Sequence, residues 1–196
     1  MTDRRLRRRR KAISPRPDML LPSRRLLLAA LSLACAGACA PPASYSAMVA
    51  AAPPGQAPAP VYRNAITVGS VTLGRDMATP WRSAVGPDQV QQALVQTLAV
   101  AGLGQPANGR FRLDGLLLTL DRPYAGFAMT VTATIAWRLT DTTNGAVVYD
   151  RAFRTLGTAT LDDAITNDNR LRIADQRAVR ANLQQLVQDL SALPSR

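Results

Sequence analysis

The sequence contains no histidine and no glutamate, and Lys11 is its only lysine. Without imidazole, a Ser-His-Asp triad and a histidine-ligated metal site are both excluded. The only cysteines, Cys35 and Cys39, lie near the N-terminus, so the rest of the chain offers no disulfide, thiolate nucleophile or zinc knuckle. An enzyme built on this chain would have to use aspartate carboxylates or hydroxyl groups. We therefore expect a non-enzymatic protein with no cofactor and no metal.

Positive charge is concentrated at the N-terminus. Residues 1–38 carry nine Arg and one Lys against two Asp, a net +8, whereas residues 39–196 carry 14 Arg against 11 Asp, a net +3. A basic run such as residues 7–11 can bind nucleic acid or anionic lipid, but a block of like charge is usually a solvated tail. Met19 could itself start a complete signal, which leaves open whether residues 1–18 are translated. We expect no nucleic-acid partner.

Residues 24–42 have the layout of an export signal. Arg24 and Arg25 precede an apolar run, and small residues surround the two cysteines that end it. The uncharged stretch from Leu26 to Ala40 has 15 residues, about 22 Å as a helix, which is short of the roughly 30 Å hydrocarbon core of a bilayer. Residues 1–38 are predicted to be an export signal with a basic extension. Residues 23–28 also resemble a twin-arginine signal, so the export route stays open.

Cys39 and Cys35 each follow three small or apolar residues, and both segments resemble the bacterial lipobox, whose cysteine is acylated before cleavage. Cys39 is favoured because it allows the longer apolar run and precedes a Pro-rich segment; Cys35 is the alternative. Ordinary cleavage after residues 38–40 would instead give a soluble periplasmic protein. Since Ala40, not Asp, follows Cys39, the family rule for inner-membrane retention is not met. An outer-membrane lipoprotein facing the periplasm is expected.

The chain after the signal divides by composition. Residues 39–60, rich in Ala and Pro, are predicted to be a lipidated cysteine with a flexible tether, because so few large apolar side chains cannot offset the entropy of ordering. Residues 61–196 are predicted to form a single globular domain.

Hydrophobic periodicity predicts four strands and two helices in this domain. In chain order they are a strand at 61–73 with a bulge at Gly69-Ser70, a helix from Gly86-Pro87-Asp88 to Gly102, a strand at 111–120 with a phase shift at Asp114-Gly115, a strand at 127–139, a hairpin turn at 142–145, a strand at 147–156, and a helix at 170–190 capped near Asp168-Asn169. The order β-α-β-β-β-α indicates an α+β two-layer sandwich, with two helices on one face of a largely antiparallel four-stranded sheet.

The strand at 127–139 alternates strictly. Phe127, Val131 and Ile135 belong to the apolar side, and Thr130, Thr132 and Thr134 belong to the other side. A broad face of threonines carries little charge and could dock a partner at low desolvation cost; threonine could equally be there for its β-propensity. We predict that Ile135 faces the helices and that the three threonines line a solvated face.

Other candidate sites are weaker. Asp162, Asp163, Asn167, Asp168 and Asn169 form a dense oxygen cluster, but they lack the spaced pattern of a calcium loop and are expected to serve turns and caps. Nothing in their spacing brings together Asp114, Asp121 and Asp150 as an acid–base pair. Aromatic side chains near loops are candidate partner contacts: Trp81, Tyr124 and Phe127.

The lipobox, the Pro-rich tether and the β-α-β-β-β-α order resemble small envelope lipoproteins of the lipopolysaccharide-assembly type and auxiliary lipoproteins of lipid-transport ABC systems. Residues 124–133 and 170–182 are similar to uncharacterised bacterial lipoproteins of this layout. The resemblance implies binding or assembly at the outer membrane, with a membrane anchor and an envelope protein or lipid as partner. The alternative is a periplasmic hydrolase that uses carboxylates or hydroxyls.

Overall fold

The computed structural model describes residues 43–75 and 85–194. Cys35, Cys39 and Trp81 lie outside these residues. The elements in chain order are the 3-10 helices η2 (Tyr45–Met48) and η3 (Pro60–Tyr62), strand β1 (Ile66–Leu73), helix α2 (Pro87–Val100), strands β2 (Phe111–Asp121), β3 (Met129–Asp141) and β4 (Val147–Ala159), and helix α3 (Asn167–Ser191).

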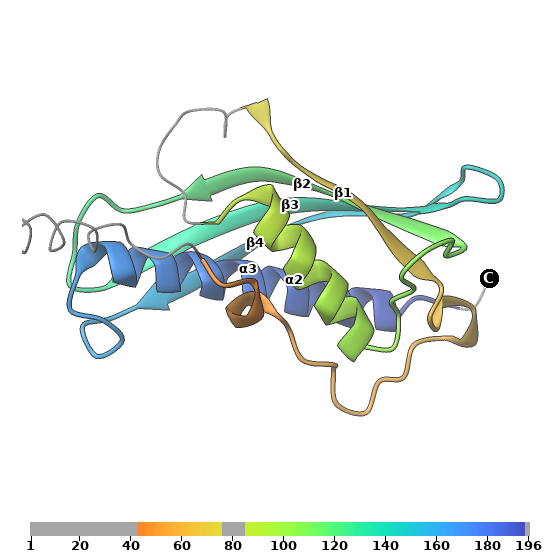
Figure 1. The fold of residues 1–196 in the computed structure, drawn as a ribbon, viewed down its shortest axis with the longest axis horizontal. Coiled ribbons are helices and arrows are strands. Elements are labelled where there is room, and N and C mark those ends of the chain that lie inside the picture. Colours follow the sequence, from red (N-terminus) through yellow and green to blue (C-terminus); the bar gives the residue numbers. More distant parts are fainter. Residues whose placement is uncertain (1–42, 76–84, 195–196) are drawn as a thin grey trace, which may run out of the picture. The chain divides into compact units, whose positions relative to one another are not determined.

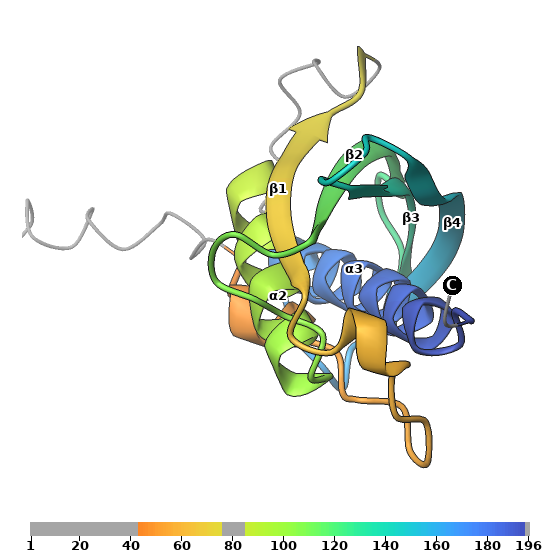
Figure 2. The ribbon, with the colours of Figure 1, turned by 90° about the vertical axis from the view of Figure 1, so that its right-hand side faces the viewer.

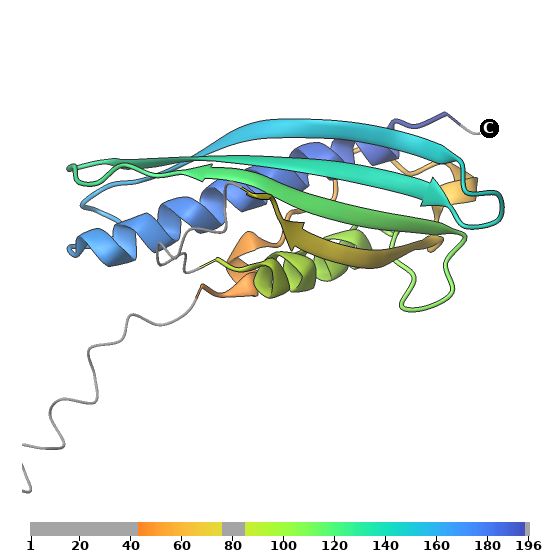
Figure 3. The same cartoon turned by 90° about the horizontal axis from the view of Figure 1, so that it is seen from above.

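The four strands form one mixed sheet in the order β1-β2-β3-β4. β1 runs parallel to β2, and the other two pairings are antiparallel. Both helices lie on the same side of the sheet (Figures 1 and 3). Viewed along α3, the sheet curves over this helix, and α2 lies beside it beneath β1 (Figure 2). The predicted α+β class and element order are confirmed. We call the face turned away from the helices the outer face.

The predicted start and end of α2 are confirmed. Gly86 is the N-cap, Pro87 occupies the first turn, and the Gln89 side chain accepts a hydrogen bond of 2.9 Å from the Gly86 N–H. After the helix, Gly102 has a φ of +68°, a left-handed conformation that suits glycine and stops the helix. α3 begins earlier than predicted. Its N-cap is Thr166, whose hydroxyl accepts from the Asn169 N–H.

The alternation of β3 places its apolar side chains in the core. Met129, Val131, Ala133, Ile135, Trp137 and Leu139 are all buried. The indole N–H of Trp137 donates a 2.8 Å hydrogen bond to Asn182 Oδ1 on α3. The Asn182 amide nitrogen in turn donates to the Phe153 carbonyl at 2.9 Å. These bonds satisfy polar groups that burial would otherwise leave unpaired.

The predicted phase shift in β2 at Asp114-Gly115 is wrong. Phe111, Leu113, Gly115 and Leu117 are buried in unbroken alternation, while Leu116 is exposed. Gly115 keeps the inward register because the Trp137 ring lies directly over it, where a Cβ would overlap the ring. The register shift occurs later, between Leu117 and Thr119.

β1 contains the predicted bulge, since its register with β2 shifts between Val68 and Val71. The strand begins at Ile66 and not at residue 61, because residues 60–62 form η3. Tyr62 of η3 is buried, with its ring centroid 5.0 Å from that of Phe111. A buried aromatic at this point fixes the chain as it enters the sheet.

Residues 43–50 differ from the expected solvated tether. Ala43, Met48 and Ala50 are buried in the main core cluster, and η2 contacts both α2 and α3. The Ala50 N–H donates a 3.1 Å hydrogen bond to the buried hydroxyl of Thr97 on α2. Burial of Met48 and the hydrogen bond to Thr97 thus place this Ala-rich segment on the helices.

Small residues let α3 approach β3 and β4 closely near its N-terminal end. A second core cluster there contains Ala133, Ala159, Ala174 and Ala178. A Cβ at Gly157 would overlap backbone atoms of Ala174 and Ala178. Within the described residues, no helix is long and apolar enough to cross a membrane.

Candidate functional site

The predicted acidic cluster serves local structure. Asp163 accepts hydrogen bonds from the Thr160 N–H at 2.9 Å and from both terminal nitrogens of Arg177 at 2.8 and 2.5 Å. The Arg177 guanidinium holds the pKa of Asp163 down, at about 2. No group of three or more Asp or Cys side chains in residues 43–75 and 85–194 could hold a metal ion. Asp163 therefore serves the turn before α3 as predicted, whereas the predicted cap near Asp168-Asn169 is wrong because Thr166 caps the helix.

Asp114 and Asp150 lie closer to each other than their spacing in the sequence indicates. Pairing across the sheet places Asp114 opposite Arg138 and Arg138 opposite Asp150. Arg138 donates to Asp150 Oδ2 at 3.0 and 2.7 Å, and Arg112 donates to Asp114 Oδ1 at 3.1 and 3.0 Å. The result is a row of opposite charges across the outer face. Register, which the sequence did not specify, creates it.

A shallow hollow of about 250 Å³ lies along this row, lined in part by Ser70, Asp114, Leu116, Arg138 and Asp150. Its two carboxylates are each engaged by a guanidinium, and Asp114 also accepts from the Ser70 N–H at 2.8 Å. Charge-assisted hydrogen bonds of this kind are strong, so protein donors already occupy both carboxylates. The hollow has the chemistry of a polar surface.

The predicted threonine face is only partly solvated. Thr130 is exposed and hydrogen-bonds to Thr158 at 3.0 Å, and half-buried Thr134 accepts from Thr119 at 3.0 Å. Thr132 is 8% exposed, so its assignment as a solvated residue is wrong. Its neighbours on the flanking strands are Asp121 and Leu156, which leaves the short side chain between two longer ones.

The aromatic candidates that the structure describes lie at one end of the domain. Tyr124 and Phe127 are on the β2–β3 loop, so Phe127 is not the core residue of β3 that its periodicity predicted. The β4–α3 loop brings Leu161 and Ile165 to the same end, on the left in Figure 1. Tyr124 is 94% exposed, Phe127 83%, Leu161 49% and Ile165 88%. We call these four side chains the apolar tip.

Buried arginines fix the loops of the apolar tip. Arg170 donates to the carbonyls of Ala164 at 3.0 Å, Ile165 at 2.6 Å and Gly126 at 3.2 Å, and also to Asn167 Oδ1. One guanidinium thereby joins both loops. Arg170 was not predicted from the sequence, although an arginine in the first turn of a helix, where cations are disfavoured, is a signal that could have identified it.

An ion pair also ties the β2–β3 loop to α3. Arg122 donates to both carboxylate oxygens of Asp175, each at 2.8 Å. Burial raises the pKa of Asp175 to about 6, and the guanidinium of Arg122 offsets part of that effect. The exposed apolar side chains of the tip therefore belong to loops that Arg170 and Arg122 hold by hydrogen bonds.

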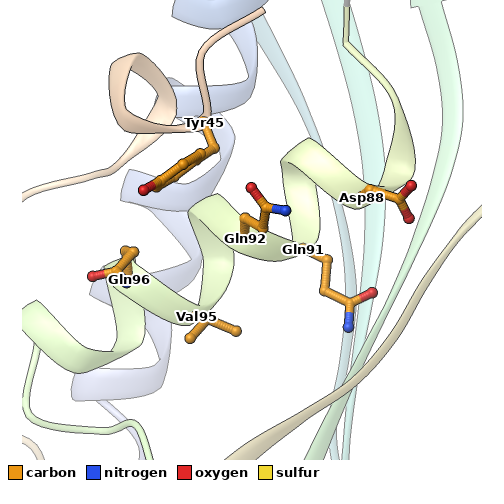
Figure 4. A pocket seen from close by; sticks show the side chains of 6 residues that line it. All are labelled: Tyr45, Asp88, Gln91, Gln92, Val95 and Gln96. Atoms are coloured by element: carbon orange, nitrogen blue, oxygen red, sulfur yellow. The ribbon is translucent and has the colours of Figure 1, made fainter.

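A groove of about 490 Å³ lies between η2 and α2 (Figure 4). Tyr45 forms one side, and the α2 residues Asp88, Gln91, Gln92, Val95 and Gln96 form the other. Asp88 is the only charged residue among them. This groove was not predicted from the sequence, because residues 45–48 were expected to belong to a tether.

No protein-family model matches the chain, and comparison with curated proteins finds no match. Solved structures do resemble it. A Xanthomonas campestris protein assigned to the family DUF330 is 16% identical, with a TM-score of 0.50 over 66% of this chain and 86% of that one. The PelC dodecamer from Paraburkholderia phytofirmans is 18% identical, with a TM-score of 0.49 over 70% and 94%. A minor lipoprotein from Acinetobacter baumannii is 15% identical, with a TM-score of 0.45 over 67% and 94%.

At these identities the similarity concerns the fold alone. The expected relation to lipopolysaccharide-assembly and ABC-transport lipoproteins stays a prediction. The chain shares the fold of the Xanthomonas campestris protein of the DUF330 family.

Proposed function

We propose that this protein is a lipid-anchored cell-envelope protein, held at the outer membrane, that binds a partner protein without catalysing a reaction. The observation that carries the binding role is the apolar tip. Large hydrophobic side chains that stay exposed on a rigid support usually mark an interaction site. Phe127 and Ile165 are exposed and take no part in the hydrophobic core. Arg170, which positions their loops, is buried, and burying a guanidinium costs desolvation free energy.

The charges around the tip indicate the partner's chemistry. Asp121, Asp162 and Asp168 are exposed near these loops, and within the described residues no salt bridge engages them. A partner that fits would present an apolar hollow with a basic rim. Such a tip is less suited to an anionic lipid surface, since the carboxylates would be repelled.

The tip is tested by photo-crosslinking in living cells. A benzophenone amino acid replaces Phe127 in the full-length protein, with the exposed Leu156 of the outer face as the matched control position. We expect a discrete crosslinked protein band from position 127 and none from position 156. The binding role is contradicted if position 127 gives no crosslink, or if both positions give the same bands.

The anchor is supported by the export signal and by Cys39 within its lipobox-like segment. Globomycin, which blocks lipoprotein signal peptidase, should cause the precursor to accumulate. Cys39→Ser should abolish both processing and membrane association, while Cys35→Ser should leave them intact. Ala40 after the cysteine favours the outer membrane, and fractionation of the two membranes tests this. Unchanged processing of Cys39→Ser would contradict the anchor at this residue.

If the protein were instead a hydrolase, the best candidate for its active site would be the hollow lined by Asp114 and Asp150. A glycosidase-like reaction needs one carboxyl group that can donate a proton and a second that is ionised. Both carboxylates are bound by arginine, so neither is free to contact a substrate. The geometry therefore supports binding over hydrolysis.

A further inference from the structure

The exposed side of α2 and η2 is almost free of charge. Its exposed residues after the first turn are Gln92, Val95, Gln96, Ala99 and Val100, and Tyr45 of η2 lies beside them (Figure 4). From residue 89 to residue 100 the sequence has no charged side chain. We call this region the uncharged surface. The exposed side of a helix in a globular protein normally carries charged side chains. Amide and aliphatic side chains in their place are therefore unusual and indicate that this surface contacts something other than bulk water.

The outer face of the sheet has the opposite character. Arg112, Asp114, Arg138 and Asp150 form the charged row, and Arg154 is exposed on the same face. Moving this face against a low-dielectric environment would desolvate several ions. Moving the uncharged surface there would desolvate only amides and a phenol, which costs far less.

The length of the chain before the structured domain decides which side can approach a membrane. Only three residues, 40–42, separate Cys39 from the buried Ala43. Four residue steps span at most about 14 Å when fully extended. The packed segment 43–50 cannot lengthen this link, because Met48 is buried and the Ala50 N–H is bonded to Thr97.

This short link starts on the helix layer. η2 contacts α2 and α3, so the chain enters the domain on the side opposite the outer face (Figure 3). To turn the outer face toward the bilayer, the link would have to pass around a helix about 10–12 Å across and then past the sheet. A link of about 14 Å is too short for that path.

We infer that the uncharged surface rests against the headgroup region of the bilayer that holds the anchor. The inference depends on the proposed function, because it requires acylation at Cys39. Tyr45 suits this position, since tyrosine combines an apolar ring with a hydroxyl that stays hydrated at the membrane interface. The outer face then points away from the membrane.

Site-specific fluorescence tests this orientation in the lipidated protein. After acylation of Cys39, the mature chain has no free thiol, so Val95→Cys and Leu156→Cys each introduce a unique labelling site. The two positions are matched exposed aliphatic residues, 44% and 64% exposed, on opposite layers. Each purified protein is checked for its acyl mass, labelled with the dye NBD, and reconstituted into phosphatidylethanolamine–phosphatidylglycerol vesicles that contain headgroup spin-labelled lipid.

We expect the label at position 95 to shift to shorter emission wavelengths and to be quenched by the spin-labelled lipid, while the label at position 156 stays unchanged. Equal quenching at both positions, or quenching at position 156 alone, would overturn the orientation. So would a label at position 95 that is shielded from aqueous iodide but not quenched by lipid, because a second protein would then cover the surface. A missing acyl mass would overturn the anchor itself, an outcome distinct from an acylated protein with an unquenched label.

Discussion

Arg122 and Asp175 form a buried bidentate ion pair, with both hydrogen bonds at 2.8 Å. The pair joins the loop after β2 to the third turn of α3. Burial dominates its electrostatics, because it raises the pKa of Asp175 from 3.8 to about 6 despite the neighbouring guanidinium. The Arg122–Asp175 pair therefore fixes the geometry of the loop, but burial makes the ionised form of Asp175 energetically unfavourable.

Asp175 makes stability fall as the pH rises above about 4. Between the unfolded pKa near 3.8 and the folded pKa near 6, the folded protein binds more protons than the unfolded chain. The stabilisation is complete below about pH 4 and is lost as the pH passes 6, a change on the order of 3 kcal/mol for this group. Urea unfolding at pH 4, 5, 6 and 7 measures it. Asp175→Asn should remove this pH dependence of the unfolding free energy. If the variant keeps the same pH dependence, Asp175 is not its cause.

Two other carboxylates give the opposite dependence at lower pH. Hydrogen bonds from Thr143 and then Arg110 lower the pKa of Asp141 to about 2, and Arg177 does the same for Asp163. Their contribution is present above about pH 4 and is lost as the pH falls toward 2. We expect Asp141→Asn to reduce the loss of unfolding free energy between pH 4 and pH 2. The dependence of the unfolding free energy on pH between 4 and 6 should stay unchanged.

Removing the apolar side chains of the tip should leave the fold intact. Phe127→Ser and Ile165→Ser alter exposed residues outside the core, so the free energy of unfolding should change by less than about 0.5 kcal/mol. Arg170→Met should instead free both loops and increase their cleavage by a protease, because three carbonyls lose their donor. The tip would not be held by Arg170 if cleavage of this variant matched that of the unaltered protein.

Trp137 and Asn182 should be energetically coupled. Asn182→Leu leaves the buried indole N–H without an acceptor and removes one donor to the Phe153 carbonyl, which should lower the free energy of unfolding by about 1–3 kcal/mol. Combining it with Trp137→Phe removes the orphaned donor, so the double variant should lose less than the sum of the two single changes. Additive losses in urea unfolding would show that the hydrogen bond contributes little.

Sequence patterns predicted most of the fold because each element carried its own local signal. The strict alternation of β3 and the Gly86-Pro87-Asp88 start of α2 depend on neighbouring residues alone. Errors arose where a distant residue decided the outcome. Gly115 stays inward because Trp137, 22 positions later, lies over it. Met48 orders an Ala-rich segment because α2 and α3 provide the pocket for it.

The candidate site was predictable only in part. Tyr124 was identified from its place in a turn, and so was Phe127, although periodicity also assigned Phe127 wrongly to the buried face of β3. Leu161 and Ile165 join them only because the two loops meet in space, and Arg170 was not recognised as the group that joins the loops. The row of Asp114, Arg138 and Asp150 depends on strand register, which the sequence pattern alone did not give.

Substitution of Met48 tests whether residues 43–50 belong to the folded domain. Its side chain is fully buried, so Met48→Ala should leave a cavity and lower the free energy of unfolding by about 2–5 kcal/mol. Tyr45→Ala, in the same short helix but 42% exposed, is the matched control and should cost less. Urea unfolding of both variants measures the difference. If Met48→Ala is as stable as the unaltered protein, residues 43–50 act as a tether after all, and the link between Cys39 and the domain becomes too long to fix which face meets the membrane.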